Sequence, residues 1–210
     1  MRARGAAEAR SDERGADARH AQTGGLDWPR TLMARGGEAL AAEHLRRRPL
    51  QPRAVRLHCM VLDCSASMVT SGALARAKGV LLGLLEEAYQ RREQVALICF
   101  GGAGVELRLP PSRAAHWNEE WVAPIGGGGG TPLVQALGAA DGLLRMQALR
   151  LAALQGWLWL MTDARTRERP ARPAYADEIR ILDFESSRAP LRRAQQLAQD
   201  WRAHYQPVSA

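Results

Sequence analysis

Residues 55–67 read VRLHCMVLDCSAS, and this stretch decides the fold. Its middle, Cys59-Met60-Val61-Leu62, is continuously apolar, which is typical of a strand buried on both faces of a parallel sheet. The run ends at a carboxylate, Asp63, and two serines follow closely. Open α/β sheets bind ligands beyond the carboxyl ends of their strands, so a functional site is expected at this junction.

Further strands and helices alternate along the chain. Apolar runs predict strands over 94–100, 156–162 and 178–184, and the alternating segment 105–109 predicts a short antiparallel edge strand. Amphipathic stretches predict helices over 71–92, 114–122, 133–144 continuing to 154, and 188–205. We therefore predict an α/β fold of three layers, with a doubly wound, mostly parallel sheet covered by helices on both faces.

The composition divides the sequence into three parts. Residues 1–25 are rich in Ala, Arg, Gly and Asp and have almost no large apolar side chain, so we expect disorder there. Residues 26–54 are predicted to form an N-terminal helical extension, with a helix over 31–47. Residues 55–206 carry the pattern described above, and we predict that they form one domain, which is long enough to bury a core.

Almost all the positive charge of the chain comes from arginine. The formal net charge is +7, and Lys78 is the single lysine among the 210 residues. A basic surface can bind nucleic acid, but no aromatic residues are interleaved with the basic ones and no zinc-finger spacing occurs. We interpret the arginines as solvated surface and expect no nucleic-acid partner.

Cysteine usage and hydropathy indicate the compartment. Cys59, Cys64 and Cys99 lie in or beside apolar runs, and an odd number without a CxxC pair argues against disulfides and zinc. No apolar run reaches the ~20 residues that cross a bilayer. The first 25 residues mix Arg with acids and lack an apolar centre, unlike a secretory signal. We expect a cytoplasmic protein with reduced thiols and no membrane partner.

The segment DCSAS places three oxygen-bearing side chains at alternate positions. Residues two apart in an extended turn point the same way, so Asp63, Ser65 and Ser67 can converge on one point. Small oxygen ligands suit Mg²⁺ or Mn²⁺. With a single direct carboxylate the ion stays electrophilic and attracts a further anionic ligand. A competing interpretation is that Ser67 caps the helix that follows.

Two later segments can complete the site. Residues 126–130 are five glycines. They let the backbone turn tightly beside the loop 63–67, which we call the first loop, or they form a merely flexible connection. Thr131 then adds a hydroxyl, and Asp163 follows the strand 156–162 and can hold the metal through water. Taken in this order beside strands of one sheet, the segments predict a divalent-metal site formed by Asp63, Ser65, Ser67, Thr131 and Asp163.

These motifs resemble the metal-ion-dependent adhesion site of von Willebrand factor A domains. The resemblance is closer to the C-terminal domain of the magnesium chelatase D subunit, and it covers roughly residues 26–206. It implies that Asp63, Ser65, Ser67 and Thr131 are direct or near-direct ligands and Asp163 a water-mediated one. The matching segments are 61–68, 88–92, 95–98, 129–133 and 160–163. Ala66, Cys64 and Ala164 depart from the family's usual residues, and none of them removes a ligand.

The resemblance also implies a function. The D subunit carries an ATPase-like domain and an acidic, proline-rich linker before this module, and this sequence shows neither; it also has no P-loop motif. We therefore expect a stand-alone, non-catalytic subunit of a magnesium or cobalt chelatase, without a nucleotide cofactor. It would work with an AAA+ ATPase subunit and a large chelatase subunit in metal insertion into a tetrapyrrole, as in cobalamin synthesis. A generic von Willebrand A adaptor of another AAA+ assembly stays open.

Two enzyme classes share single features of this sequence. An aspartyl phosphatase uses a carboxylate after a buried strand, but Ser65 stands where such enzymes need a second carboxylate. A thiol enzyme based on Cys64 needs a base, and neither His58 nor His116 is clearly placed for that role. Both classes explain less of the sequence than the metal site does.

The tryptophans offer packing or binding surface. Trp157 and Trp159 alternate within a strand, so we predict that they fill the core on one face. Trp117 and Trp121 are one helical turn apart near the glycine run. Core packing is favoured for them, and a partner contact stays open.

Overall fold

A computed structural model describes residues 23–49, 54–115, 117, 125, 127–151, 153–186 and 189–208. The chain divides into two compact units, residues 1–53 and residues 54–210. The disorder predicted for residues 1–25 falls almost wholly outside the described residues and stays a prediction.

The N-terminal unit is a small hairpin around a short helix. Its elements are β1 (Thr23–Leu26), α2 (Trp28–Arg35), a 3-10 helix (Ala42–His44) and β2 (Arg47–Pro49), which pairs antiparallel with β1. The Asp27 carboxylate caps α2 by accepting the Arg30 N–H at 3.3 Å. The helix predicted over 31–47 is wrong in extent, because α2 ends at Gly36, whose φ of +58° suits glycine.

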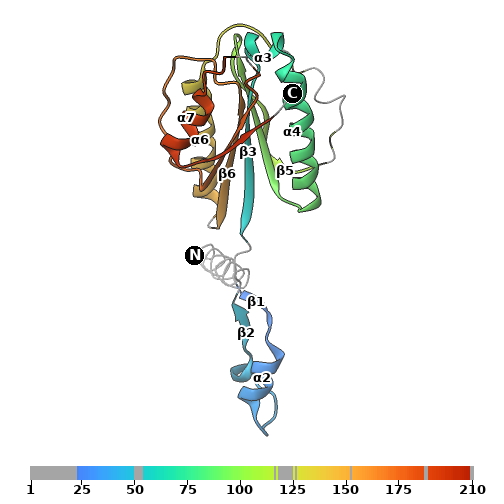
Figure 1. Ribbon diagram of the computed structural model, residues 1–210. Helices are drawn as coiled ribbons and strands as arrows, with labels where there is room; N and C mark the ends of the chain where they lie inside the picture. The colour runs from blue at the N-terminus through green and yellow to red at the C-terminus, as the bar shows by residue number, and fades with distance from the viewer. Residues whose placement is uncertain are drawn as a thin grey trace, which may run out of the picture. The chain divides into compact units, whose positions relative to one another are not determined.

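The second unit is built on a six-stranded sheet in the order β5-β4-β3-β6-β7-β8 (Figure 1). The strands are β3 (Val55–Asp63), β4 (Gln94–Gly101), β5 (Gly104–Arg113), β6 (Leu154–Thr162), β7 (Glu178–Asp183) and β8 (His204–Pro207). All neighbours pair parallel except β5, which runs antiparallel to β4 at the edge. The mostly parallel sheet with an antiparallel edge strand is therefore confirmed, and that edge strand is longer than predicted.

Helices cover both faces of this sheet. They are α3 (Ala66–Thr70), α4 (Ala73–Gln90), α6 (Leu133–Arg150) and α7 (Arg193–Trp201). Figure 1 shows α4 on one face and α6 with α7 on the other. Leu57 and Val61 of β3 belong to the core under α6 and α7, whereas Met60 and Leu62 belong to the core under α4. Both faces of the strand are buried, which explains its unbroken apolar run and confirms the three-layer α/β fold.

Three predicted helices differ from the observed ones. The helix predicted over 71–92 is α4, which begins later than predicted because Gly72, with φ +72°, separates α3 from α4. The helix predicted over 188–205 is wrong in extent: α7 ends at Trp201, and the exposed edge strand β8 follows it. The helix predicted over 114–122 lies mostly outside the described residues, and residues 114 and 115 are not helical.

Buried cysteines and tryptophans behave largely as predicted. All three cysteines are free and buried, and burial raises the pKa of Cys59 to about 12. Trp159 lies in the core under α4, and Trp157 and Trp117 pack against that core while partly exposed. Trp121 lies outside the described residues. Within the described part of the chain, none of the helices is long and apolar enough to cross a membrane.

His58 is buried near the amino end of β3 in a polar cluster. Its Nδ1 accepts a hydrogen bond from the Trp159 indole N–H at 3.0 Å, and its Nε2 lies 2.7 Å from the Glu93 carboxylate. Arg56 pairs with the other Glu93 oxygen at 2.8 Å, and its guanidinium lies 4.4 Å from the Trp157 ring centroid. Because an indole N–H can only donate, this arrangement requires neutral His58 with an unprotonated Nδ1. Burial lowers the pKa of His58, although Glu93 opposes the shift.

The lowered pKa of His58 predicts a loss of stability in mild acid. The unfolded chain takes up a proton near pH 6.5 more readily than the folded chain does. The stabilisation from neutral His58 is therefore present above pH 6.5 and is lost as the pH falls. Urea unfolding at pH 7.5 and 5.5 should show a larger loss for the wild type than for His58→Gln. The control His204→Gln, at an exposed histidine, should lose as much as the wild type, and an equal loss in His58→Gln would contradict the prediction.

Candidate metal centre

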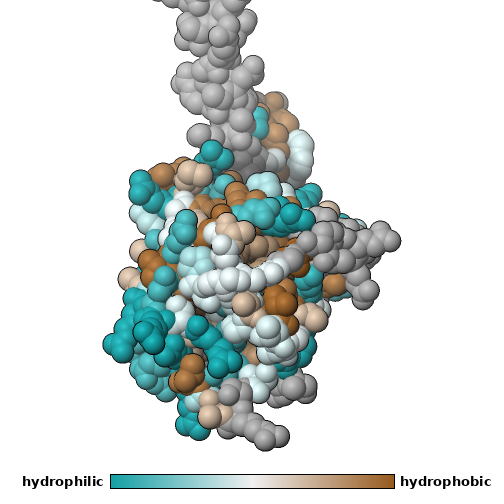
Figure 2. All heavy atoms as spheres, turned by 90° about the horizontal axis from the view of Figure 1, so that it is seen from above, coloured by the Kyte–Doolittle hydropathy of each residue, from teal (hydrophilic) through white to brown (hydrophobic). Residues whose placement is uncertain are grey.

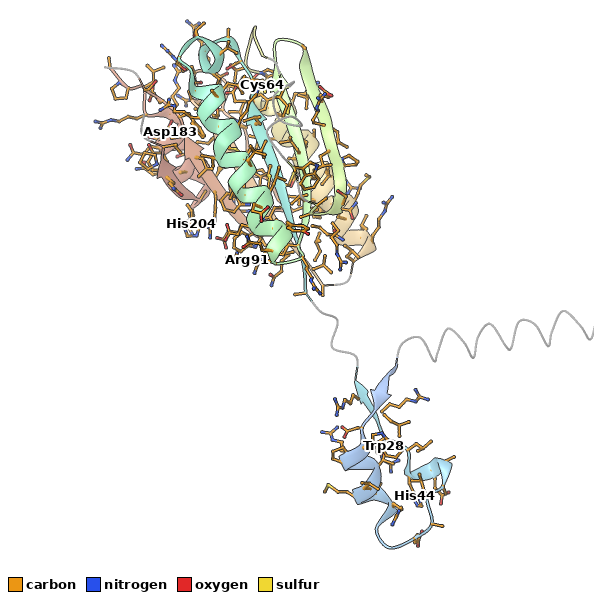
Figure 3. All side chains as sticks on the ribbon, turned by 90° about the vertical axis from the view of Figure 1, so that its right-hand side faces the viewer. Trp28, His44, Cys64, Arg91, Asp183 and His204 are labelled. Carbon is orange, nitrogen blue, oxygen red and sulfur yellow. The ribbon has the colours of Figure 1, made fainter. Side chains whose placement is uncertain are left out.

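The predicted site residues follow strands that meet at the centre of the sheet. The chain runs outward from β3 to β4 and β5 on one side, and β6, β7 and β8 extend the sheet on the other. The carboxyl ends of β3 and β6 therefore flank the point where the strand order reverses, where open α/β sheets bind ligands. Figure 3 shows Cys64 and Asp183 toward this edge and Arg91 and His204 toward the opposite one.

Asp63, Ser65 and Ser67 converge as the alternate spacing predicts. Asp63 is fully buried, and its Oδ1 accepts the Ser65 N–H at 2.8 Å, which closes a tight turn. The Ser65 and Ser67 hydroxyl oxygens lie 3.2 Å apart. Ser67 lies inside α3, whose N-cap position is Ser65 without a side-chain capping bond. The interpretation of Ser67 as a helix cap is therefore wrong, and both hydroxyls remain available as ligands.

The glycine run is packed against this turn rather than loosely connected. The Gly128 N–H donates to the Cys64 carbonyl at 2.7 Å, and the Ala66 N–H donates to the Gly129 carbonyl at 3.1 Å. A Cβ on Gly127 would lie 2.3 Å from the Cys64 carbonyl oxygen, so no larger residue fits there. These contacts bring the segment of Thr131 to the first loop. Within the described residues, no hydrogen bond ties the Thr131 hydroxyl to the other four predicted ligands.

Thr162 joins β6 to the first loop, and the sequence reasoning did not include it in the site. Its hydroxyl donates to Asp63 Oδ2 at 2.5 Å and accepts the Ala164 N–H at 2.8 Å. Asp163, the next residue, is 4% exposed, and its Oδ1 accepts the Arg165 N–H at 3.2 Å. The signal in the sequence was a lone hydroxyl at the end of an otherwise apolar strand. Thr162 fixes the second carboxylate oxygen of Asp63.

Asp183 is a further carboxylate at this edge that the sequence reasoning missed. It ends β7 opposite Thr162 and is 5% exposed. Its oxygens accept the Tyr205 hydroxyl and the Glu185 N–H, each at 2.8 Å. Burial raises the pKa of Asp183. The signal in the sequence was a carboxylate one residue before the end of the predicted strand 178–184. Its hydrogen bond from Tyr205 ties β7 to β8 beside the site.

The electrostatics of the site favour a cation. Burial raises the pKa of Asp63, and the Asp163 carboxylate adds to this shift, while hydrogen bonds from Thr162 and Ser65 oppose it. Neither Asp63 nor Asp163 has an ion pair among the residues that the structure describes. Buried carboxylates without a counter-charge are costly, and a divalent cation removes that cost.

The donor set fits Mg²⁺ or Mn²⁺ better than a softer metal. In the described ranges, no three His, Cys, Asp or Glu side chains gather into a metal cluster. A site here therefore needs the serine and threonine hydroxyls beside the carboxylates, and such all-oxygen sets suit hard cations. Of the two candidate bases for a Cys64 thiol enzyme, His58 is bound to Trp159 and Glu93 near the amino end of β3, and His116 lies outside the described residues.

Sequence relatives include magnesium-chelatase subunits. No protein-family model matches the chain. An uncharacterised protein of Mycobacterium tuberculosis is 34% identical over 192 residues, which are 83% of this chain and 30% of that protein. The magnesium-chelatase 60 kDa subunit of Cereibacter sphaeroides is 37% identical over 110 residues, which are 52% of this chain and 19% of that subunit. The chain thus spans less than a third of either relative.

Solved structures share the fold at low sequence identity. Manganese-loaded TRAP protein of Plasmodium vivax has a TM-score of 0.54 and 15% identity, covering 75% of this chain and 69% of that one. A von Willebrand factor type A protein of Catenulispora acidiphila has a TM-score of 0.53 and 15% identity, covering 78% and 40%. At this identity the likeness is one of fold.

Proposed function

We propose that this von Willebrand factor A domain, related in sequence to magnesium-chelatase subunits, is a non-catalytic module that binds a partner protein through a divalent metal ion. The observation that carries the proposal is the geometry around Asp63. This buried carboxylate lies beside Asp163 and the paired Ser65 and Ser67 hydroxyls, and no cation balances it in the described residues.

The residues of the site would have different roles in binding the ion. Asp63, Ser65, Ser67 and Thr131 would bind Mg²⁺ or Mn²⁺ directly, and Asp163 through water. When bound, the ion supplies an electrophilic centre that accepts a carboxylate oxygen of the partner. Thr162 and the Ser65 N–H orient the Asp63 carboxylate through their hydrogen bonds. The manganese-loaded TRAP structure supports this choice of ion for the fold.

The sequence relatives support a place in a chelatase-type complex. Magnesium-chelatase subunits of several bacteria match this chain at 31–39% identity over parts of their length. The proposed partners are an AAA+ ATPase subunit and a large chelatase subunit. They would insert magnesium or cobalt into a tetrapyrrole in the cytoplasm, and this chain would have no catalytic residue of its own. A generic adaptor of another AAA+ assembly is the alternative, because a match over 192 residues is to a protein not named as a chelatase subunit.

Removing Asp63 tests the proposal. Wild-type chain should retain the ATPase partner in a pull-down with Mg²⁺ and release it in EDTA. Asp63→Ala should lose the Mg²⁺-dependent binding, because the direct carboxylate ligand is gone. The control Glu87→Ala removes an exposed carboxylate from an i,i+4 pair on α4 and should bind normally. Unchanged Mg²⁺-dependent binding by folded Asp63→Ala would rule out the metal bridge, that is, the contact in which the bound ion joins this chain to a carboxylate of the partner.

A further inference from the structure

Five arginines border the candidate metal centre on one side. Arg165, Arg167 and Arg169 lie on the loop that follows Asp163, and Arg192 and Arg193 lie at the start of α7. All five are exposed, and none has an ion pair among the described residues. We name these five residues the arginine rim. Figure 2, which looks onto this edge of the sheet, shows hydrophilic side chains gathered on the α7 side.

A groove lined by part of the arginine rim begins one residue beyond the predicted ligand Asp163 in the chain. Its volume is about 630 Å³, and Arg167, Arg169 and Arg193 line it. Leu133 and Ala164, which are both almost fully buried, also line it. Ala164 directly follows the predicted ligand Asp163, and Leu133 lies two residues after Thr131. A chain segment that reaches the metal can therefore continue into this groove.

Two carboxylates also line the groove, and both are already hydrogen bonded. Glu168 accepts the Val134 N–H at 2.7 Å, at the amino end of α6, where the helix dipole favours a negative charge. Asp200 accepts the Gln196 side-chain N–H at 3.0 Å. Three arginines and two engaged carboxylates therefore line the groove, and the exposed Arg165 and Arg192 lie outside its lining.

The loop that carries three of the arginines is held in place. The Arg193 guanidinium donates to the Thr166 carbonyl. At the base of the loop, Arg172 donates to the carbonyls of Trp201 and Ala176, each at 3.2 Å. The Tyr175 N–H donates to the Asp141 carboxylate at 2.7 Å. A loop fixed in this way presents its charges with little further loss of entropy on binding.

We propose that the arginine rim binds an acidic segment of a partner protein, with one carboxylate of that segment on the metal and further Asp or Glu side chains along the groove. The proposal rests on the metal-dependent docking proposed above. Guanidinium groups pair with carboxylates in planar, two-bonded geometry, so the rim adds specificity to a metal bridge that any carboxylate could make. A single-stranded nucleic acid fits less well, because no aromatic side chain on which bases could stack lines the groove.

Peptide binding to the full chain tests the arginine rim. The probe is a fluorescein-labelled twelve-residue peptide with a central Asp and four flanking Glu, and the reference replaces the four Glu by Gln. In Mg²⁺ the acidic peptide should bind roughly tenfold or more tightly than the reference, the size of a few rim ion pairs. Arg167→Glu with Arg169→Glu should remove this preference. The control variant is Arg145→Glu with Arg150→Glu. Both arginines are exposed, have no ion pair among the described residues and lie toward the far end of α6, so this variant should keep the preference.

The arms of the experiment separate the two proposals. Loss of the preference in the rim variant, with reference-peptide binding still abolished by EDTA, supports both. If the preference survives in the rim variant, or if the acidic peptide binds no better than the reference, the arginine rim proposal is overturned while EDTA sensitivity still supports the metal bridge. Rim-dependent binding that ignores EDTA and Asp63→Ala overturns the metal bridge alone. A twelve-base-pair DNA duplex that binds the rim more tightly than the acidic peptide also overturns the rim proposal.

Discussion

In EDTA the Asp63→Asn variant is expected to be more stable than the wild type, and in excess Mg²⁺ the order is expected to reverse. Asp63 is fully buried, its pKa is raised by burial, and no cation pairs with it in the described residues. Because its folded pKa lies above the unfolded value of 3.8, ionised Asp63 lowers the stability of the metal-free chain as the pH rises above 3.8. Asparagine keeps the shape and removes the charge.

The expected size of each effect follows from general magnitudes. Replacing the carboxylate should raise the free energy of unfolding in EDTA by about 1 kcal/mol, because relief of the buried charge exceeds the loss of the hydrogen bond from the Thr162 hydroxyl, which the asparagine amide nitrogen cannot accept. Mg²⁺ at about 100 times its dissociation constant should stabilise the wild type by about 2.7 kcal/mol and leave Asp63→Asn unchanged. Urea unfolding at pH 7.5 with Mg²⁺ or EDTA measures both. Glu87→Gln, at an exposed carboxylate, should follow the wild type in each condition. A wild type that gains nothing from Mg²⁺ would contradict the metal centre.

Gly129→Ala is expected to lower the free energy of unfolding by about 2–4 kcal/mol. Gly129 has φ +70°, and a Cβ there would lie 2.4 Å from the Gly102 Cα. The two loops meet backbone to backbone, and the Gly102 N–H donates to the Gly128 carbonyl at 2.5 Å. Relief of the clash must move the segment that leads to Thr131, so stabilisation by Mg²⁺ should also decrease. Urea unfolding with and without Mg²⁺ measures both losses.

A second glycine provides the matched control. Gly138 lies in α6, and an added Cβ meets nothing within 4 Å. Gly138→Ala should therefore stabilise the chain by about 0.5–1 kcal/mol through helix propensity, with the response to Mg²⁺ unchanged. If Gly129→Ala behaved like Gly138→Ala, the packed glycine loop would not be needed for the site.

Much of the sheet could be predicted because burial dominates its sequence. The runs around Val61, Ile98 and Leu160 are apolar on both faces, and all three residues are fully or almost fully buried. The strand β8 could not be predicted in the same way. Its four residues are all exposed, so no apolar pattern marks it, and it is held to β7 by strand pairing and by the hydrogen bond from Tyr205 to Asp183. The end of α7 at Trp201 was likewise hidden, because the residue that ends it in a left-handed conformation is Arg202 rather than glycine.

The candidate site was predictable where ligand chemistry and spacing coincide. Asp63, Ser65 and Ser67 are close in sequence, so alternate spacing alone predicted their convergence. Thr162 was missed because its role depends on a partner from a different strand, Asp63, which no local pattern reveals. The arginine rim was interpreted as ordinary solvated surface for the same reason. Its residues come from two segments of the chain, and only the fold brings Arg167 and Arg169 of one segment and Arg193 of the other to one groove.

The pairing of β3 with β6 also determines when the centre can exist. The hydrogen-bonded Asp63 and Thr162 are 99 residues apart in sequence, with β4, β5 and α6 between them. A nascent chain leaves the ribosome amino end first, so the first loop is synthesised long before its partner strand. Until β6 emerges and pairs, Asp63 has no Thr162 to orient it and no Asp163 beside it. The proposed metal-dependent capture of a partner would thus require that β6 has been synthesised and has paired with β3.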